Sequence, residues 1–254
     1  MYASIKTSQK FAAIGYAAIG ALMLALPAQA NLVSNGGFES TTAGVGQLTT
    51  NTDATGWING LSSAADPGYN FIFAAATADS SGAEGQYGTV ALWGPNNGSA
   101  NGFGASPDGG NLLGADGAFQ TGPISQIING LIAGNTYTLG FWWGGAQQAG
   151  FNGETTEQWQ VTFGSQTQST AVLTNVDQGF TGWQRQTFDF VASSASELLS
   201  FLAIGTPSGI PPFVLLDGVT LDAAATAVPE PGMLALLGIG LIGIPALRKL
   251  RNKR

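Results

Sequence analysis

The chain has 254 residues, with eight basic and fifteen acidic side chains, a formal net charge of −7, and neither cysteine nor histidine. The missing residue types exclude disulfides, thiol nucleophiles, Ser-His-Asp and Cys-His catalysis, and histidine-ligated zinc. Carboxylates, hydroxyl groups and oxygen-bound metal ions are what remains for chemistry.

Residues 1–30 have the three parts of a secretory signal peptide. Lys6 and Lys10 form a positive start, residues 11–26 are apolar, and Ala28-Gln29-Ala30 is a small-x-small cleavage site. We therefore expect a signal helix that is removed on export, and a mature chain that begins at Asn31.

The charges are unevenly distributed along the chain. Two basic residues lie in the signal segment and five in residues 248–254, so that Arg185 is the only basic residue between Asn31 and Pro231, against fifteen acidic ones. This body has a net charge of −14 and repels nucleic acid and anionic lipid. The charge suits a neutral polysaccharide or calcium as a partner, and no nucleic acid.

Residues 31–222 read as one all-β domain, because short β-branched and aromatic segments alternate with Gly, Asn and Ser turn clusters. Two sheets with one apolar face each predict a jelly-roll or Greek-key β-sandwich. Residues 94–110 are expected to form a surface loop and 223–227 a linker. The expected strands are Leu32–Phe38, Asn70–Ala75, Thr89–Trp93, Ile124–Asn129, Thr136–Trp143, Gln158–Gly164, Ser169–Leu173, Gln184–Val191, Leu199–Ile204 and Phe213–Leu221.

Neighbouring residues on a strand face opposite ways, so Trp142 points outward if Trp143 is in the core. A solvent-facing tryptophan next to amide and hydroxyl side chains is typical of a saccharide platform, and Trp142, Gln158 and Gln160 are the candidate carbohydrate-binding residues, with Thr162 beside them. The alternative is that a loop, such as 144–156, covers this face and that Trp142 serves packing.

Catalysis has little support in the sequence. A glycosidase needs two carboxylates across a cleft, and Glu154 and Glu157 are the pair close enough in sequence to share a loop. Paired acids in a Gly/Thr-rich segment are more typical of solvated surface, so we expect no enzymatic activity.

The end of the chain has a further three-part pattern: Val228-Pro229-Glu230-Pro231, an apolar run over 232–247, and a basic cluster over 248–254. This segment, 228–254, resembles the PEP-CTERM sorting signal. The resemblance implies a transmembrane sorting helix with a cytoplasmic basic end, and an exosortase-type membrane protease as partner. It also implies a protein that is exported, held briefly in the membrane, and then placed on the cell surface or in the extracellular matrix. The alternative is a plain membrane anchor.

The body resembles the galactose-binding-domain-like jelly rolls of carbohydrate-binding modules. Three segments carry the resemblance: Asn31–Glu39, Pro123–Leu139 and Phe213–Leu221. The resemblance implies a structural calcium ion between Glu39 and Asp217, although Gly218 stands where the family has a second acid. Calcium requires six to eight oxygen ligands, so backbone carbonyls would complete the site. The alternative is that both acids cap backbone NH groups.

Together these patterns predict a non-catalytic exported protein of the cell surface or exopolysaccharide matrix that binds a neutral glycan. A purely structural surface or biofilm protein without a small ligand is the alternative, and a carboxylate-based polysaccharide hydrolase is a third possibility.

Overall fold

The computed structural model describes residues 31–61 and 66–224. In these two ranges the chain forms β-strands and one short 3-10 helix, η1 (Pro95–Asn97). None of the helical structure described there is long and apolar enough to cross a membrane. The expected signal helix and sorting helix lie outside the described residues.

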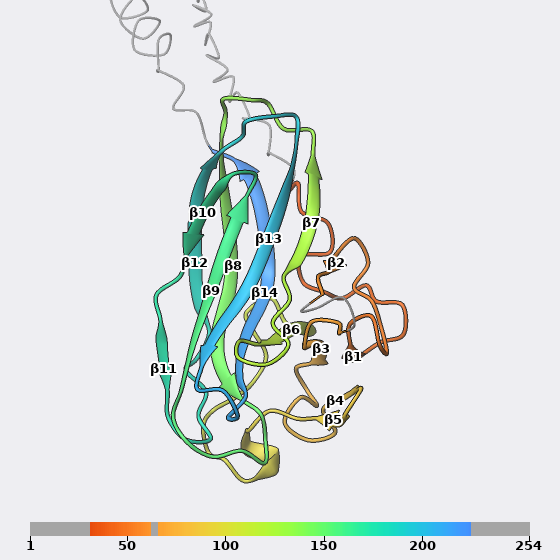
Figure 1. Ribbon diagram of the computed structural model, residues 1–254, viewed down its shortest axis with the longest axis vertical. Coiled ribbons are helices and arrows are strands. Elements are labelled where there is room, and N and C mark those ends of the chain that lie inside the picture. Colours follow the sequence, from red (N-terminus) through yellow and green to blue (C-terminus); the bar gives the residue numbers. More distant parts are fainter. Residues whose placement is uncertain (1–30, 62–65, 225–254) are drawn as a thin grey trace, which may run out of the picture.

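The strands form two large sheets and a small hairpin (Figure 1). The six-stranded sheet has the order β1 (Gly46–Gln47), β3 (Asn70–Ala74), β6 (Asn111–Asp116), β14 (Pro212–Ala223), β8 (Thr136–Gln147), β12 (Gln184–Val191). The other sheet, here called the five-stranded sheet after its continuous path, has the order β10 (Gln166–Ser169), β9 (Thr155–Phe163), β13 (Ser196–Thr206), β7 (Ile124–Asn129), β2 (Ile58–Asn59), and a sixth strand, β11 (Leu173–Asn175), also pairs with β9. The hairpin pairs β4 (Ala83–Gly85) with β5 (Gly88–Val90).

The order of the strands identifies the sandwich as a jelly roll. All the strand pairs are antiparallel. The chain changes sheet at each step from β6 to β9 and again at each step from β12 to β14. The expected all-β jelly-roll sandwich is therefore confirmed.

The main core fills the space between the two sheets. Burial alternates along β9, where Trp159, Val161 and Phe163 are fully buried and the residues between them are partly exposed. Phe201 of β13 contacts Phe141 of β8 edge-on, with ring centroids 5.2 Å apart. Alternating apolar residues from both sheets interdigitate here, as expected for a sandwich.

A second core lies on the outer face of the six-stranded sheet. Phe73, Phe213 and Leu215 point to this face and pack with Leu92 and Phe103, which lie in the excursion between β3 and β6. Residues 75–110 thus cover one end of the outer face. The stretch expected as a loop, 94–110, contains no strand and only η1.

Most of the expected strands are present, and two are wrong. The bounds of 124–129 and 184–191 agree with β7 and β12, and six others are found with shifted ends. The segment 32–38 is irregular because Asn35 and Phe38 have φ of +51° and +58°. It nevertheless follows the last strand, since Leu32 NH donates to Leu221 O at 2.9 Å. Ser169–Leu173 is not one strand: Ser169 ends β10, Leu173 begins β11, and residues 170–172 connect the two.

Glutamine side chains join the two sheets along one edge. Gln166 of β10 donates to Val191 O of β12 at 2.6 Å and accepts from Val191 NH at 3.2 Å. Gln168 donates to Asp189 O at 2.8 Å. The amide groups thus take the place of a strand-to-strand ladder between β10 and β12.

Candidate functional site

The first predicted site residue, Asp217, lies on β14 and is fully buried. One carboxylate oxygen accepts from Gly218 NH at 2.7 Å, and the other accepts from the Ser106 hydroxyl. Burial raises the pKa of Asp217 to about 7; the two hydrogen bonds lower it, and the nearby carboxylates of Asp108 and Glu39 raise it further. Asp217 is therefore a buried acid with acidic neighbours.

Glu39 lies at the same seam between the first segment and β14, but its carboxylate is engaged elsewhere: Oε1 accepts from Asn111 NH at 2.8 Å. Asp108, which no sequence pattern indicated, raises the pKa of Asp217 more than Glu39 does. A Cβ placed on Gly37 would lie 2.6 Å from Asp108 Oδ2 and 3.6 Å from Asp217 Oδ1. Within residues 31–61 and 66–224, no group of three or more Asp, Glu, His or Cys side chains is arranged to hold a metal ion.

Trp142 points outward from the six-stranded sheet while Trp143 lies in the core, as strand alternation predicts. The indole is half-buried, and the Arg185 guanidinium carbon stands 5.7 Å from its ring centroid. Arg185 is held there by Gly218 O at 3.3 Å and the Thr220 hydroxyl at 3.4 Å. One part of the expected platform is thus occupied by the protein's own cation.

Gln158 and Gln160 do not join Trp142 in a platform. They lie on β9 and face outward from the five-stranded sheet, whereas Trp142 lies on β8 and faces outward from the six-stranded sheet. The core separates the two outer faces. The three residues therefore do not form one platform, because β8 and β9 follow each other in sequence but belong to different sheets. Carbohydrate binding by any of them stays a prediction.

Glu154 and Glu157 do not face each other across a cleft. Glu154 is exposed before β9, whereas Glu157 is fully buried and accepts from the Thr155 hydroxyl at 2.5 Å. Burial raises the pKa of Glu157 to about 8. Its Oε2 has no hydrogen-bond partner.

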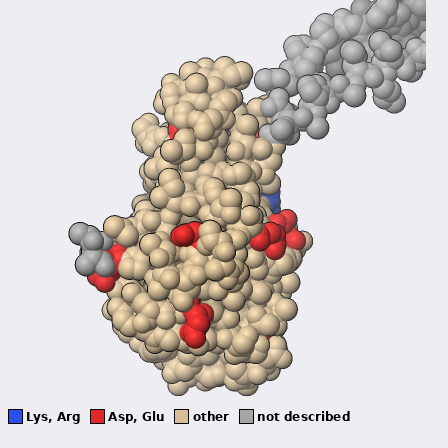
Figure 2. Space-filling model, turned by 90° about the vertical axis from the view of Figure 1, so that its right-hand side faces the viewer, with Lys and Arg blue, Asp and Glu red and all other residues tan. Residues whose placement is uncertain are grey.

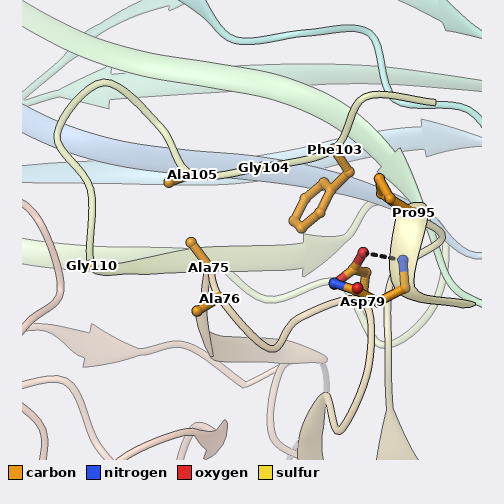
Figure 3. Close-up of a pocket in the computed structure, with 9 residues that line it drawn as sticks. Ala75, Ala76, Asp79, Pro95, Phe103, Gly104, Ala105 and Gly110 are labelled. Atoms are coloured by element: carbon orange, nitrogen blue, oxygen red, sulfur yellow. Dashed lines mark hydrogen bonds between the residues drawn. The ribbon is translucent and has the colours of Figure 1, made fainter. Parts of the chain in front are cut away.

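A hollow of about 350 Å³ lies beside the excursion that covers the outer face. Figure 3 shows Phe103, Pro95 and Asp79 at one end of it and Ala75, Ala76 and Ala105 toward the other. Asp79 is buried, but Asn96 donates to both of its carboxylate oxygens at 2.9 Å. Each oxygen of the acid in this hollow thus has a hydrogen-bond partner within the protein.

The second hollow, here called the aromatic cleft, has about the same volume, 360 Å³, and different walls. It lies at the end of the sandwich where β14 begins, between the β4–β5 hairpin, the turn after β6, the loop after β8 and the β13–β14 turn. The residues used below are Tyr69, Tyr87, Asp116, Phe119, Gln148 and Phe151.

Aromatic rings in the cleft are exposed to solvent to an unusual degree. Tyr87 is 64% exposed, Phe119 44% and Phe151 38%. The Phe119 ring lies 6.0 Å from that of Tyr87 and 5.2 Å from that of the buried Tyr69. Gln120 holds Tyr87 in place by donating to its hydroxyl at 3.1 Å. Exposed rings beside amide groups are the usual walls of a ligand site.

Asp116 lines the same cleft and is only 1% exposed. Its Oδ1 accepts from Ala118 NH at 2.8 Å and Phe119 NH at 3.1 Å, while Oδ2 has no partner. Burial raises the pKa of Asp116 to about 6, and the two hydrogen bonds oppose that rise. The Asp116 charge in turn adds to the effect of burial in raising the pKa of Tyr69.

Sequence reasoning missed the aromatic cleft because its residues come from five separate segments. Tyr87 lies in a Gly-rich turn, and Asp116-Gly117-Ala118-Phe119 reads as an ordinary turn. The available signal was a pair of aromatic residues placed in turns rather than in strands, where a core residue is expected.

Comparison with solved structures finds carbohydrate-binding jelly rolls at low similarity. TmCBM61 in complex with beta-1,4-galactotriose has 15% identity, a TM-score of 0.42, and coverage of 77% of this chain and 99% of its own. The CBM22-1 xylan-binding domain from Paenibacillus barcinonensis Xyn10C has 14% identity, a TM-score of 0.36, and coverage of 80% and 100%. A putative sugar binding protein from Bacteroides thetaiotaomicron has 12% identity, a TM-score of 0.35, and coverage of 77% and 100%.

The sequence matches no curated protein. Its C-terminal residues 227–252, however, match the PEP-CTERM protein-sorting motif, which includes the predicted motif residues Val228, Pro229, Glu230 and Pro231. These four residues lie outside the described part of the structure. The chain thus carries a PEP-CTERM sorting motif behind its jelly-roll body.

Proposed function

We propose that this protein is an exported, non-catalytic glycan-binding protein of the cell surface or the exopolysaccharide matrix. The observation that carries the proposal is the aromatic cleft, where the exposed rings of Tyr87, Phe119 and Phe151 surround a hollow of monosaccharide scale. Sugar rings stack on such faces, and amide groups such as Gln148 orient their hydroxyls. A body with net charge −14 disfavours acidic polysaccharides, so the partner is a glycan without acidic groups.

The sorting motif supports the route to that location. We propose that the apolar tail holds the protein in the membrane until an exosortase-type protease cuts near Val228–Pro231. Intact-mass measurement of the protein from its native host should show the loss of Arg248–Arg254. Most mature molecules retaining that peptide would favour a plain anchor.

A calcium ion at the seam between Glu39 and Asp217 is an accessory proposal. It is supported by the burial of Asp217 near the carboxylates of Asp108 and Glu39, because a cation there would offset their repulsion. Since no three such side chains are arranged around one point in the described part of the chain, backbone carbonyls would supply most of the oxygen ligands.

Glycan binding is tested by measuring how tightly two variants, Tyr87→Ala and Trp142→Ala, bind the members of a polysaccharide panel. Tyr87→Ala should weaken binding by more than about 1 kcal/mol, the usual mark of an interface hot spot. It should leave the fold intact, since the ring is mostly exposed. Trp142→Ala removes an aromatic ring opposite Asp217 on β14, five residues from the end of that strand at Pro212 where the cleft lies, and is the matched control; it should retain binding.

Loss of binding in the Trp142→Ala protein alone would move the site from the aromatic cleft to the surface around Trp142. Absence of any glycan binding by the parent protein would leave the purely structural role as the function. Turnover of a bound polysaccharide would contradict the non-catalytic assignment.

A further inference from the structure

The buried wall of the aromatic cleft carries a charge that the protein does not balance. Asp116 is 1% exposed, and its Oδ2 has no hydrogen-bond partner. Leaving a buried carboxylate oxygen unpaired costs free energy, more than for a neutral group. In the other hollow, the comparable acid Asp79 receives a hydrogen bond on each oxygen. The protein therefore supplies a hydrogen bond to both oxygens of Asp79 but to only one oxygen of Asp116.

No cation of the described chain is available to Asp116. Arg185 is the only basic residue between Asn31 and Ala224. Its guanidinium is bound to Gly218 O and Thr220 and lies over Trp142, on the outer face of the six-stranded sheet. Figure 2 shows separate acidic patches and very little basic surface on the face it displays. When Asp116 is ionised, at a pH above its pKa of about 6, its counter-charge would have to come from outside the described chain, as from a bound ligand.

The rings around Asp116 suit a cation as well as a sugar. Tyr69, Tyr87 and Phe119 form a group with centroid separations of 5.2 to 6.3 Å. The π face of an aromatic ring attracts an ammonium group by about 0.5–2 kcal/mol, depending on desolvation. A carboxylate behind three rings combines this attraction with a charge-assisted hydrogen bond.

We infer that the aromatic cleft binds an amino sugar, with the ammonium group of the ligand donating to Asp116 Oδ2 and a sugar face stacked on Tyr87 or Phe119. This inference rests on the glycan-binding function proposed above and names the class of glycan. A neutral sugar would use the rings and leave the carboxylate without its counter-charge.

The test compares two oligosaccharides that differ only at nitrogen. A β-1,4-linked glucosamine tetramer and its N-acetylated counterpart are titrated calorimetrically into the purified protein near pH 6.5, with a glucose tetramer as neutral reference. The glucosamine tetramer should bind about tenfold more tightly than either. Raising sodium chloride from about 0.05 to 0.5 M should weaken only its binding, by several-fold.

Asp116→Asn keeps the Oδ1 acceptor for Ala118 and Phe119 NH and removes the charge. It should abolish the preference for the glucosamine tetramer while binding to the neutral tetramers persists. Glu84→Gln is the matched control, because it removes an exposed acid from the neighbouring hairpin, and it should retain the preference. If Asp116→Asn does not fold, the comparison of the glucosamine tetramer with a tetralysine peptide, which carries four charges and no sugar, still decides.

The outcomes separate the two proposals. Equal binding of all three tetramers overturns the amino-sugar inference and leaves glycan binding in place. A preference that survives in folded Asp116→Asn also overturns it, as does equally tight binding of a tetralysine peptide. Absence of binding by every tetramer, and by the wider polysaccharide panel, rejects the glycan-binding function itself.

Discussion

At the scale of single residues, the most unusual groups are the buried carboxylates that the fold leaves incompletely bonded. Glu157 and Asp116 each keep one oxygen without a partner. Both have a raised pKa, to about 8 and about 6, mainly because burial disfavours the charged form. These acids make the folded state sensitive to pH in a direction opposite to that of an acid in a salt bridge.

Glu157 should reduce stability as the pH rises. Its pKa in the folded protein, about 8, exceeds its ordinary value of 4.5, so the unfolded chain loses the proton first. The contribution is fully present below pH 4.5 and is lost progressively up to pH 8, with a slope of up to about 1.4 kcal/mol per pH unit. Urea unfolding at pH 5, 7 and 8.5 measures this slope.

Glu157→Gln imitates the protonated acid and should flatten the profile, with a gain in stability at pH 8.5. Glu154→Gln changes an exposed acid three residues away and serves as control. A profile for Glu157→Gln as steep as that of the parent would show that other groups set the pH dependence.

Reasoning from single residues predicted correctly which way side chains point from a strand, but it did not predict which strands share a sheet. The alternation of side chains on a strand placed Trp142 outward and Trp143 inward, because this rule depends only on neighbours in the chain. It did not reveal that Gln158 and Gln160 belong to the other sheet. Partnership between strands depends on the crossing connections of the jelly roll, which no local pattern encodes.

At the scale of elements, β14 contains the one irregularity that shapes the predicted seam. Its pairing with β8 shifts register between Asp217 and Thr220, and Gly218 has a φ of +56°. A β-bulge of this kind re-aims the neighbouring side chains and favours glycine. The positive φ at this bulge thus explains why Gly218 stands where the resembled family has a second acid.

Gly218→Ala should destabilise the protein by more than about 1 kcal/mol, since strain at positive φ costs about that much and contacts add to it. The new Cβ would lie 3.1 Å from Trp142 Cδ1 and 3.2 Å from Asp108 Cβ. Thermal unfolding followed by circular dichroism measures the loss.

Gly182→Ala is the comparison, because Gly182 has a φ of +81° but no atom within 4 Å of the added Cβ. It should cost less than Gly218→Ala. Equal losses in the two variants would mean that backbone strain alone, and not packing against the seam, requires Gly218.

Elements with strong β-branched and aromatic content were predictable, and elements built around glycine were not. β6 was missed because Asn111–Asp116 contains Gly114 and Ala115, which lower its apparent strand propensity. The structure explains Gly114: a Cβ there would lie 2.8 Å from the Phe73 ring. The end of β8 was predicted too early for the same reason, because the strand continues through Gly144 and Gly145, four residues beyond the predicted end at Trp143.

At the scale of the whole molecule, the first and last parts of the body are joined at one seam. Leu32 and Gly36 bond to Leu221 and Val219 through their backbones. The proposed calcium ion would bind at this seam, where the first and last parts of the body are bonded and where neighbouring carboxylates repel one another. Its presence or absence should therefore affect the stability of the whole domain.

Calcium should raise the melting temperature relative to the same protein in a chelator, by an amount set by RT ln(1 + [L]/Kd), or about 2.7 kcal/mol at a hundred times Kd. Asp217→Asn and Glu39→Gln should each remove the difference. Asp53→Asn, an exposed acid far from Asp217 in sequence, is the control. Identical melting curves with calcium and with chelator would exclude the ion.

The strand directions decide how this protein presents its cleft. Both described ends of the body, near Leu32 and Ala224, lie by the end of β14 at Ala223, at the top of Figure 1, whereas the aromatic cleft lies by the other end at Pro212. Eleven steps of about 3.3 Å separate those two ends of β14 by roughly 36 Å. While the sorting tail is still in the membrane, the cleft would face away from the lipid, toward the polymer outside. Capture of a glycan would then not need to wait for release from the membrane.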